Sequence, residues 1–150
     1  MREHGSRPAT KNFDALLCFT LYAANDAFLR AYSSRLKPFG MSYLQYIVLL
    51  SLWREGAQNA GTIAGRLGID RAILDPEFDR LAELGFVVRE GETDPWVSLT
   101  EEGIALEGAV YDVQQEIACE AGMTGETLDF IRSELAAMMQ RMRAAPSHRA

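Results

Sequence analysis

The feature that most constrains the fold is a pair of short helical segments joined by a tight connection. The first predicted helix covers AGTIAGRL, residues 60–67, and Asn59 can cap its start. A two-residue connection, Gly68–Ile69, leads to Asp70, which can cap a second helix that ends before Gly85. Two helices joined this tightly are typical of a helix-turn-helix.

Two predicted strands follow the helix pair. FVVRE at 86–90 and WVSLT at 96–100 alternate apolar and polar residues around the turn-forming GETDP. They predict a small β-hairpin, the wing of a winged helix-turn-helix. This module is expected over residues 42–100.

Long helices are expected on the N-terminal side of this module. Apolar residues recur at helical spacing from Lys11 to Lys37, and no Pro or Gly interrupts them until Pro38. A further helix begins at Ser42, where Ser42 and Gln45 can form a capping box, and it runs to Gly56.

Two more helices are expected after the wing, one from Ser98 or Thr100 to about Gly122 and one from Gly125 to about Met142, capped by Thr124. Apolar stripes on terminal helices must be buried against something, and in a chain of 150 residues a second copy is the natural partner. We therefore predict a homodimer. The prediction is a single domain, 1–150, mainly α with a small β-hairpin, with dimerisation helices at 11–40 and 100–143 and flexible ends at 1–10 and 144–150.

The composition and the spacing of the cysteines count against a membrane protein, a secreted disulfide-rich protein and a zinc protein. No apolar run reaches the roughly 18 residues of a membrane span, and the start MREHGSRPATKN lacks the apolar region of a signal peptide, so a cytoplasmic protein without membrane contact is expected. Cys18 and Cys119, about a hundred residues apart, fit neither a secreted disulfide scaffold nor a zinc site. They are interpreted as buried thiols or redox switches, and no metal or cofactor is expected.

The order of elements resembles the MarR family of dimeric bacterial regulators over nearly the whole chain. Within that family, LLCFTLYAANDAF resembles the first-helix signature of the OhrR branch, the organic-hydroperoxide sensors, and MSYLQYIVLLSLWRE is equally similar to that branch. The resemblance implies a winged helix-turn-helix dimer held by its terminal helices. It also implies binding to double-stranded DNA at a palindromic operator.

The resemblance assigns roles to four residues. Cys18 matches the peroxide-reactive cysteine, and Tyr32 and Tyr43 match two tyrosines that hydrogen-bond it from across the dimer interface. Cys119 falls at the place of the resolving cysteine found in some members, and a disulfide to Cys18 would form across subunits. The alternative is that Cys18 is an inert small hydrophobe and that the tyrosines are interface aromatics.

The chemistry of these residues suits a sensor. An ordinary thiol, with a pKa of about 8.5, is mostly protonated at neutral pH, and two phenolic hydroxyls can stabilise its anion. Apolar neighbours would favour an organic hydroperoxide over a small polar one; they are Leu17, Phe19, Leu21 and Phe28. Attack on the peroxide gives a sulfenic acid, which condenses with a second thiol.

The predicted recognition helix is unusually acidic. The branch resembles L-D-S-x-T-L-T-P-L-L-K-R-L at this point, whereas residues 69–81 read I-D-R-A-I-L-D-P-E-F-D-R-L. The wing also loses its usual arginines. Residues 57–100 hold four arginines and eight carboxylates, a balance of −4, and the whole chain carries −6, which counts against DNA binding. The remaining candidates for DNA contact are Arg71, Arg80 and Arg89.

Three functions follow from these patterns. The first is a homodimeric regulator in which Cys18 oxidation alters DNA binding, and the second is a redox-responsive protein that acts through a protein partner instead of binding DNA alone. A thiol peroxidase ranks last because nothing resembles a reductant site. No enzyme is expected, since the only histidines, His4 and His148, lie at the chain ends and a Ser-His-Asp site is disfavoured.

Overall fold

The computed structural model describes residues 10–146 and divides into two compact units, Met1–Val113 and Gln114–Ala150. The predicted flexible ends lie mostly outside the described residues. Within the described part, Thr10 and Ala144 belong to helices. The division into a dimerisation part and a winged part stays a prediction.

The first unit opens with two helices at almost the predicted positions. Helix α1 spans Thr10–Leu36, and a 3₁₀ turn, η1 at Lys37–Phe39, replaces its last predicted residue because Pro38 fits only the start of a new turn. Helix α2 spans Tyr43–Glu55. The predicted capping box is present: the Gln45 backbone N donates to Ser42 Oγ at 3.1 Å, and the Ser42 backbone N donates to Gln45 Oε1 at 2.9 Å.

The helix-turn-helix is formed by α3 at Ala60–Leu67 and α4 at Arg71–Glu83. Gly68 joins them in the left-handed conformation, with φ of 67°, which glycine adopts without steric cost. The Asp70 carboxylate accepts the Ala72 backbone N–H at 2.9 Å and caps α4 as predicted. The prediction that the Asn59 side chain caps α3 is wrong, because this side chain makes no cap hydrogen bond to the helix.

The wing contains one strand more than predicted. Strands β2 at Val87–Glu90 and β3 at Trp96–Leu99 form the expected hairpin, and β1 at Gln58–Asn59 adds to the other side of β3, in the order β1-β3-β2 with all pairs antiparallel. Two residues are too few to show an alternating pattern, so β1 could not be predicted from the sequence. The fold is mainly helical, with a three-stranded sheet.

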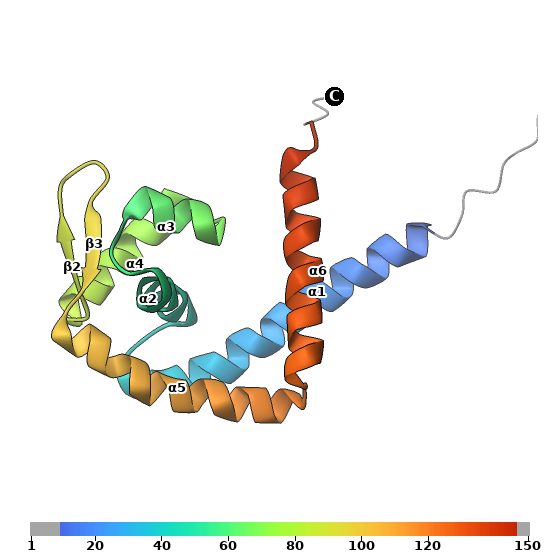
Figure 1. Cartoon of the computed structure of the whole chain (residues 1–150), viewed down its shortest axis with the longest axis horizontal. Helices are drawn as coiled ribbons and strands as arrows, with labels where there is room; N and C mark the ends of the chain where they lie inside the picture. Colours follow the sequence, from blue (N-terminus) through green and yellow to red (C-terminus); the bar gives the residue numbers. More distant parts are fainter. Residues whose placement is uncertain (1–9, 147–150) are drawn as a thin grey trace, which may run out of the picture. The chain divides into compact units, whose positions relative to one another are not determined.

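The core of the first unit lies where α2, α3, α4 and the sheet meet, which Figure 1 shows as a cluster of short elements. The recognition helix α4 enters it through Leu74, Phe78 and Leu81, all fully buried and spaced for one helical face. Other fully buried side chains come from the neighbouring elements and include Val48, Leu49, Leu52, Ile63 and Val97. The opposite face of α4 is therefore left to solvent.

Helix α5 spans Glu101–Ala121 and crosses the boundary between the units. Thr100 starts it, because its Oγ1 accepts the Gly103 backbone N–H at 3.0 Å and donates to the Gly85 carbonyl at 2.6 Å. The Gly103 carbonyl in turn accepts the Trp53 indole N–H at 2.9 Å, which ties α5 to α2.

Helix α6 spans Gly125–Ala144, and Thr124 caps it by accepting the Thr127 backbone N–H at 3.2 Å. None of its described residues is buried within the single chain. Over residues 10–146, no helix is both long and apolar enough to cross a bilayer.

Candidate functional site

The two predicted sensor tyrosines lie together in an aromatic cluster at the junction of α1 and α2. The Tyr32 and Tyr43 rings have centroids 5.3 Å apart, and Tyr46 stacks on Tyr32 at 4.9 Å with an interplanar angle of 19°. Phe28, one turn before Tyr32 on α1, adds a ring at 6.4 Å. Tyr46 was not singled out from the sequence, because it reads there as one of many apolar residues of α2.

The three tyrosines of this cluster differ in how far their side chains are buried. Tyr32 and Tyr46 are buried, whereas Tyr43 is half-buried. Burial raises the pKa of the Tyr43 hydroxyl above its ordinary value, and the neighbouring Tyr32 raises it further. Tyr43 is therefore a neutral hydrogen-bond donor at physiological pH.

Cys18 lies on α1 but far from the tyrosines of its own chain. It precedes Tyr32 by 14 positions on one continuous helix, which corresponds to about 21 Å at 1.5 Å per residue. Its thiol is exposed, as are the neighbouring side chains of Leu16, Phe19 and Tyr22. The predicted set of Cys18, Tyr32 and Tyr43 is thus not brought together within one chain.

Cys119 lies near the end of α5 in the second unit, and its thiol is exposed. Neither cysteine forms a disulfide in the described part of the chain. In the single chain neither fits the interpretation as a buried thiol.

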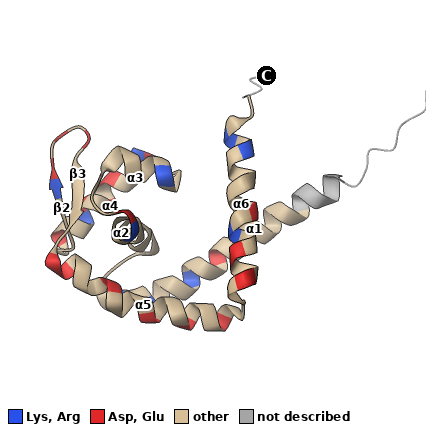
Figure 2. Ribbon diagram, in the orientation of Figure 1, with Lys and Arg blue, Asp and Glu red and all other residues tan. Residues whose placement is uncertain are grey.

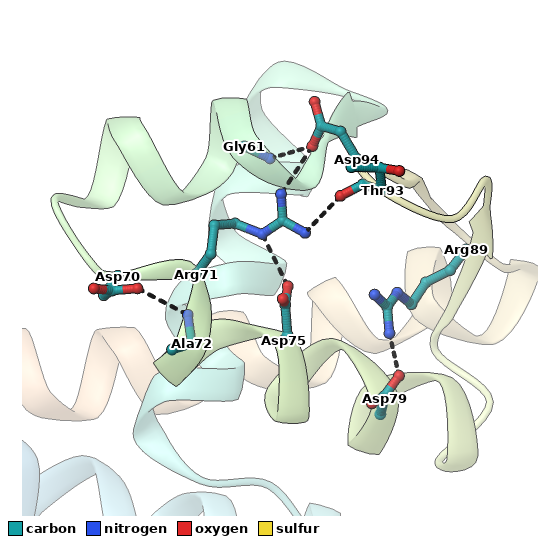
Figure 3. A network of polar contacts seen from close by, with 9 residues as sticks. All are labelled: Gly61, Asp70, Arg71, Ala72, Asp75, Asp79, Arg89, Thr93 and Asp94. Atoms are coloured by element: carbon teal, nitrogen blue, oxygen red, sulfur yellow. Dashed lines mark hydrogen bonds and ion pairs between the residues drawn. The ribbon is translucent and has the colours of Figure 1, made fainter.

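The second candidate site is the surface formed by α4 and the wing. Arg71, at the start of α4, is held by three acceptors (Figure 3): its Nε donates to Asp75 Oδ1 at 2.9 Å, its Nη1 to Asp94 Oδ1 at 3.1 Å and its Nη2 to the Thr93 carbonyl at 3.4 Å. Only 30% of its side chain is exposed. Arg71 thus connects α4 to the loop between β2 and β3.

Asp94 is the centre of this network, and sequence reasoning did not single it out. Its Oδ1 also accepts the Gly61 backbone N–H at 2.8 Å, and its Oδ2 accepts the Asn59 side-chain N–H at 3.1 Å. The wing therefore supplies the cap of α3 that Asn59 was expected to provide. The Gly61 N–H, followed by Asn59 and Arg71, holds the pKa of the Asp94 carboxyl below its ordinary value.

Arg89, on β2, pairs with Asp79 of α4. Its guanidinium lies 5.7 Å from the centre of the Phe78 ring, and its buried Nε has no acceptor within the described part of the chain. Asp79 is 66% exposed, whereas Arg89 is only 22% exposed. The carboxylate is therefore the more solvent-exposed partner of the pair.

The other two arginines of the module are also paired with carboxylates. Arg80 Nη1 lies 3.1 Å from Glu83 Oε2, and Arg66 Nη1 lies 3.1 Å from Glu55 Oε1. The loop of the wing also carries acidic residues, which are drawn red in Figure 2. Among residues 57–100, each arginine has a carboxylate partner, so the predicted contacts of Arg71, Arg80 and Arg89 with DNA require these pairs to open.

A further contact joins the two candidate sites. The Gln45 side-chain amide donates from Nε2 to Glu77 Oε2 at 2.7 Å, while its Oε1 accepts the Ser42 backbone N–H. Gln45 is buried and lies two positions from Tyr43. The start of α2, which carries Tyr43, is thus hydrogen-bonded to the recognition helix. Over residues 10–146, the structure holds no group of three metal-ligating side chains.

No family model matches the chain. A comparison with curated proteins finds the HTH-type transcriptional regulator TtmR of Methylorubrum extorquens, 38% identical over 86% of this chain and 67% of that protein. It also finds the organic hydroperoxide resistance transcriptional regulator of Bacillus subtilis, 29% identical over 83% of this chain and 87% of that protein. These relatives are transcriptional regulators and not enzymes, as expected from the sequence.

Solved structures agree with these relatives. AbfR of Staphylococcus epidermidis superimposes with a TM-score of 0.80 at 27% identity, over 90% of this chain and 96% of that one. AbfR has also been solved reduced and bound to DNA, and with a disulfide formed. A MarR-family regulator from Rhodococcus, at 24% identity and a TM-score of 0.73 over 87% of this chain and 95% of that one, shares the fold. The chain therefore belongs to the MarR family of DNA-binding transcriptional regulators.

Proposed function

We propose that this regulator senses organic hydroperoxides through oxidation of Cys18. The observation that carries the proposal is the exposed Cys18 thiol on an apolar stretch of α1, in a chain that also carries the Tyr32–Tyr43 pair at the junction of α1 and α2. Two relatives support it: the hydroperoxide resistance regulator of Bacillus subtilis, and AbfR, which has been solved in reduced and disulfide forms.

The sensor is completed by a second copy of the chain. Because Cys18 and Tyr32 lie about 21 Å apart along one straight helix, the tyrosines can donate to a Cys18 thiolate only from the partner subunit. Exposed apolar side chains on α1 and α6 supply a surface for that partner; they include Leu16, Phe19, Leu128, Ile131 and Met142. Tyr32 and Tyr43 then act across the interface.

The oxidation is a two-step reaction. The Cys18 thiolate attacks the terminal oxygen of the hydroperoxide, an S–O bond forms, the O–O bond breaks, and the alkoxide leaves as the alcohol after it takes up a proton. The Cys119 thiol then attacks the sulfenic acid, a disulfide forms and water leaves. The peroxide is reduced and the two thiols are oxidised.

Thiol titration of the dimeric protein with tert-butyl hydroperoxide tests this proposal. The wild-type protein should form a Cys18–Cys119 disulfide between subunits, visible as a dimer on non-reducing electrophoresis. Cys119→Ser should stop at a sulfenic acid that a dimedone-type probe traps, and Cys18→Ser should not react. An unmodified Cys18 in the wild-type protein would contradict the proposal.

A second candidate function is regulation through a protein partner without autonomous DNA binding. The pairing of every arginine in residues 57–100 with a carboxylate favours it. Binding of the reduced protein to random duplex DNA at several salt concentrations decides between the two. A log–log slope near zero supports the partner, and a steep negative slope supports direct DNA binding.

A further inference from the structure

We propose that the Asp79 carboxylate substitutes for a DNA phosphate at Arg89 inside the free protein and thereby weakens the sequence-independent binding of the winged module to DNA. The inference concerns DNA binding, the activity of the family, and does not depend on the oxidation of Cys18. It concerns the arginines that the sequence had offered as DNA contacts, Arg71 and Arg89.

The geometry of Arg71 leaves little of its donor capacity for a phosphate. Three of its guanidinium N–H groups point to Asp75, Asp94 and the Thr93 carbonyl, and the first two acceptors are carboxylates like the anion that a phosphate would present. Asp94 in addition caps α3 through Gly61. Opening the Arg71 network would therefore loosen the wing, so Arg71 positions the wing while it remains in this network.

Arg89 is held differently and is the arginine that DNA can recruit. Its guanidinium carbon lies 5.7 Å from the centre of the Phe78 ring, and the guanidinium pairs with Asp79, which is the more exposed partner of the two. A phosphate that approaches from solvent meets the Asp79 carboxylate first and must displace it. Neither residue takes part in capping a helix, so the Arg89–Asp79 pair can exchange without unfolding the wing.

The carboxylate partners lower the net affinity that contacts with DNA phosphates can contribute. Each arginine–phosphate contact replaces an arginine–carboxylate contact of similar chemistry, and the displaced carboxylate is left beside the phosphate. Backbone contacts then contribute little net affinity, so binding to random DNA is weak. Sites that add contacts to base edges gain over random sites.

The experiment compares two variants of the reduced full-length protein that each remove one negative charge. Asp79→Asn removes the carboxylate that pairs with Arg89, and Glu92→Gln removes a wing carboxylate with no ion pair among residues 10–146. Binding to random duplex DNA is measured by fluorescence anisotropy over a range of salt concentrations. Asp79→Asn should bind several-fold more tightly than Glu92→Gln, with a log–log salt slope steeper by about 0.9 per dimer half-site, the value for one added phosphate contact.

The double variant Asp79→Asn/Arg89→Ala shows whether Arg89 is the residue released. It should return the salt slope to the wild-type value, and thermal unfolding of each variant confirms that it is folded. The proposal would be overturned by equal salt slopes for Asp79→Asn and Glu92→Gln, or by a loss of affinity in Asp79→Asn. It would also be overturned if the double variant kept the salt slope of Asp79→Asn.

Discussion

Tyr43 shows how a single side chain combines packing with a chemical role. Its ring packs against Tyr32 and Tyr46, and partial burial raises its pKa above the ordinary value of 10.0. A group whose folded pKa is raised stabilises the fold fully below its unfolded pKa, and this contribution is lost as the pH rises through the folded value. We therefore expect the protein to lose stability as the pH rises above 10.0, the ordinary value.

Chemical unfolding at several alkaline pH values, followed together with tyrosinate absorbance, measures this effect. Tyr43→Phe keeps the ring and removes the ionising group, so its stability should fall less steeply with pH than that of the wild type. Parallel pH profiles for the two proteins would show that Tyr43 does not ionise in a buried setting.

The capping of α3 by Asp94 could not be predicted from the sequence. Ser42, Asp70 and Thr124 were identified as caps because a cap and the N–H that it accepts lie within three residues of one another. Asp94 caps α3 from the wing, 33 positions after Gly61. No local pattern signals such a contact, and the pairing of Arg71 with Asp94 escaped prediction for the same reason.

At the scale of elements, one partly buried polar pair adds to the apolar contact between α2 and α4. The Gln45 amide is buried and donates to Glu77, a residue found where the OhrR-like pattern has Leu. Glu77→Ala leaves a buried donor without an acceptor, which costs about 1–3 kcal/mol. We expect a loss of that size in the free energy of unfolding by urea. Glu83→Ala removes only an exposed ion pair with Arg80 and should cost under about 1 kcal/mol; equal losses would contradict a special role for Glu77.

The junction between the wing and α5 depends on the absence of a side chain at Gly103. A Cβ at this position would lie 2.1 Å from the Phe86 carbonyl oxygen, which is backbone and cannot move aside cheaply. Gly103→Ala should therefore lower the melting temperature strongly. Gly108→Ala, on the same helix with no atom within 4 Å of its Cβ, should raise stability by up to about 1 kcal/mol through helix propensity. A neutral Gly103→Ala would disprove the close approach.

Elements with strong local signals could be predicted closely, and those held by distant partners could not. Helices α2, α3 and α4 begin directly after the residues predicted to cap them, and α1 ends at Leu36, one residue before the expected Lys37. Strand β1 is defined only by pairing with β3, about 40 positions later, so it has no pattern of its own. The candidate redox residues came from a family resemblance, and their grouping around Cys18 stays a prediction.

At the scale of the whole molecule, an apolar stripe on α6 is left unburied within the part of the chain that the structure describes. On α6 the stripe consists of Leu128, Ile131, Leu135, Met138 and Met142, spaced by three or four positions, and none of these side chains is buried. Such a face is stable in water only when it packs against another surface, and a second copy of α6 is the partner that the family resemblance implies. Dimerisation through α6 would bury this stripe.

Sedimentation of two matched variants tests the dimer. Ile131→Asp places a charge in the stripe, whereas Gln140→Asp places the same charge nine positions later, on the opposite face of the helix because each residue advances the helix by about 100°. The wild type and Gln140→Asp should sediment as dimers at micromolar concentration, and Ile131→Asp should dissociate, since burying an unpaired carboxylate costs several kcal/mol. On the proposed arrangement, in which the tyrosines act on Cys18 across subunits, the dissociated variant should also react more slowly with hydroperoxide. A dimeric Ile131→Asp protein would place the interface elsewhere.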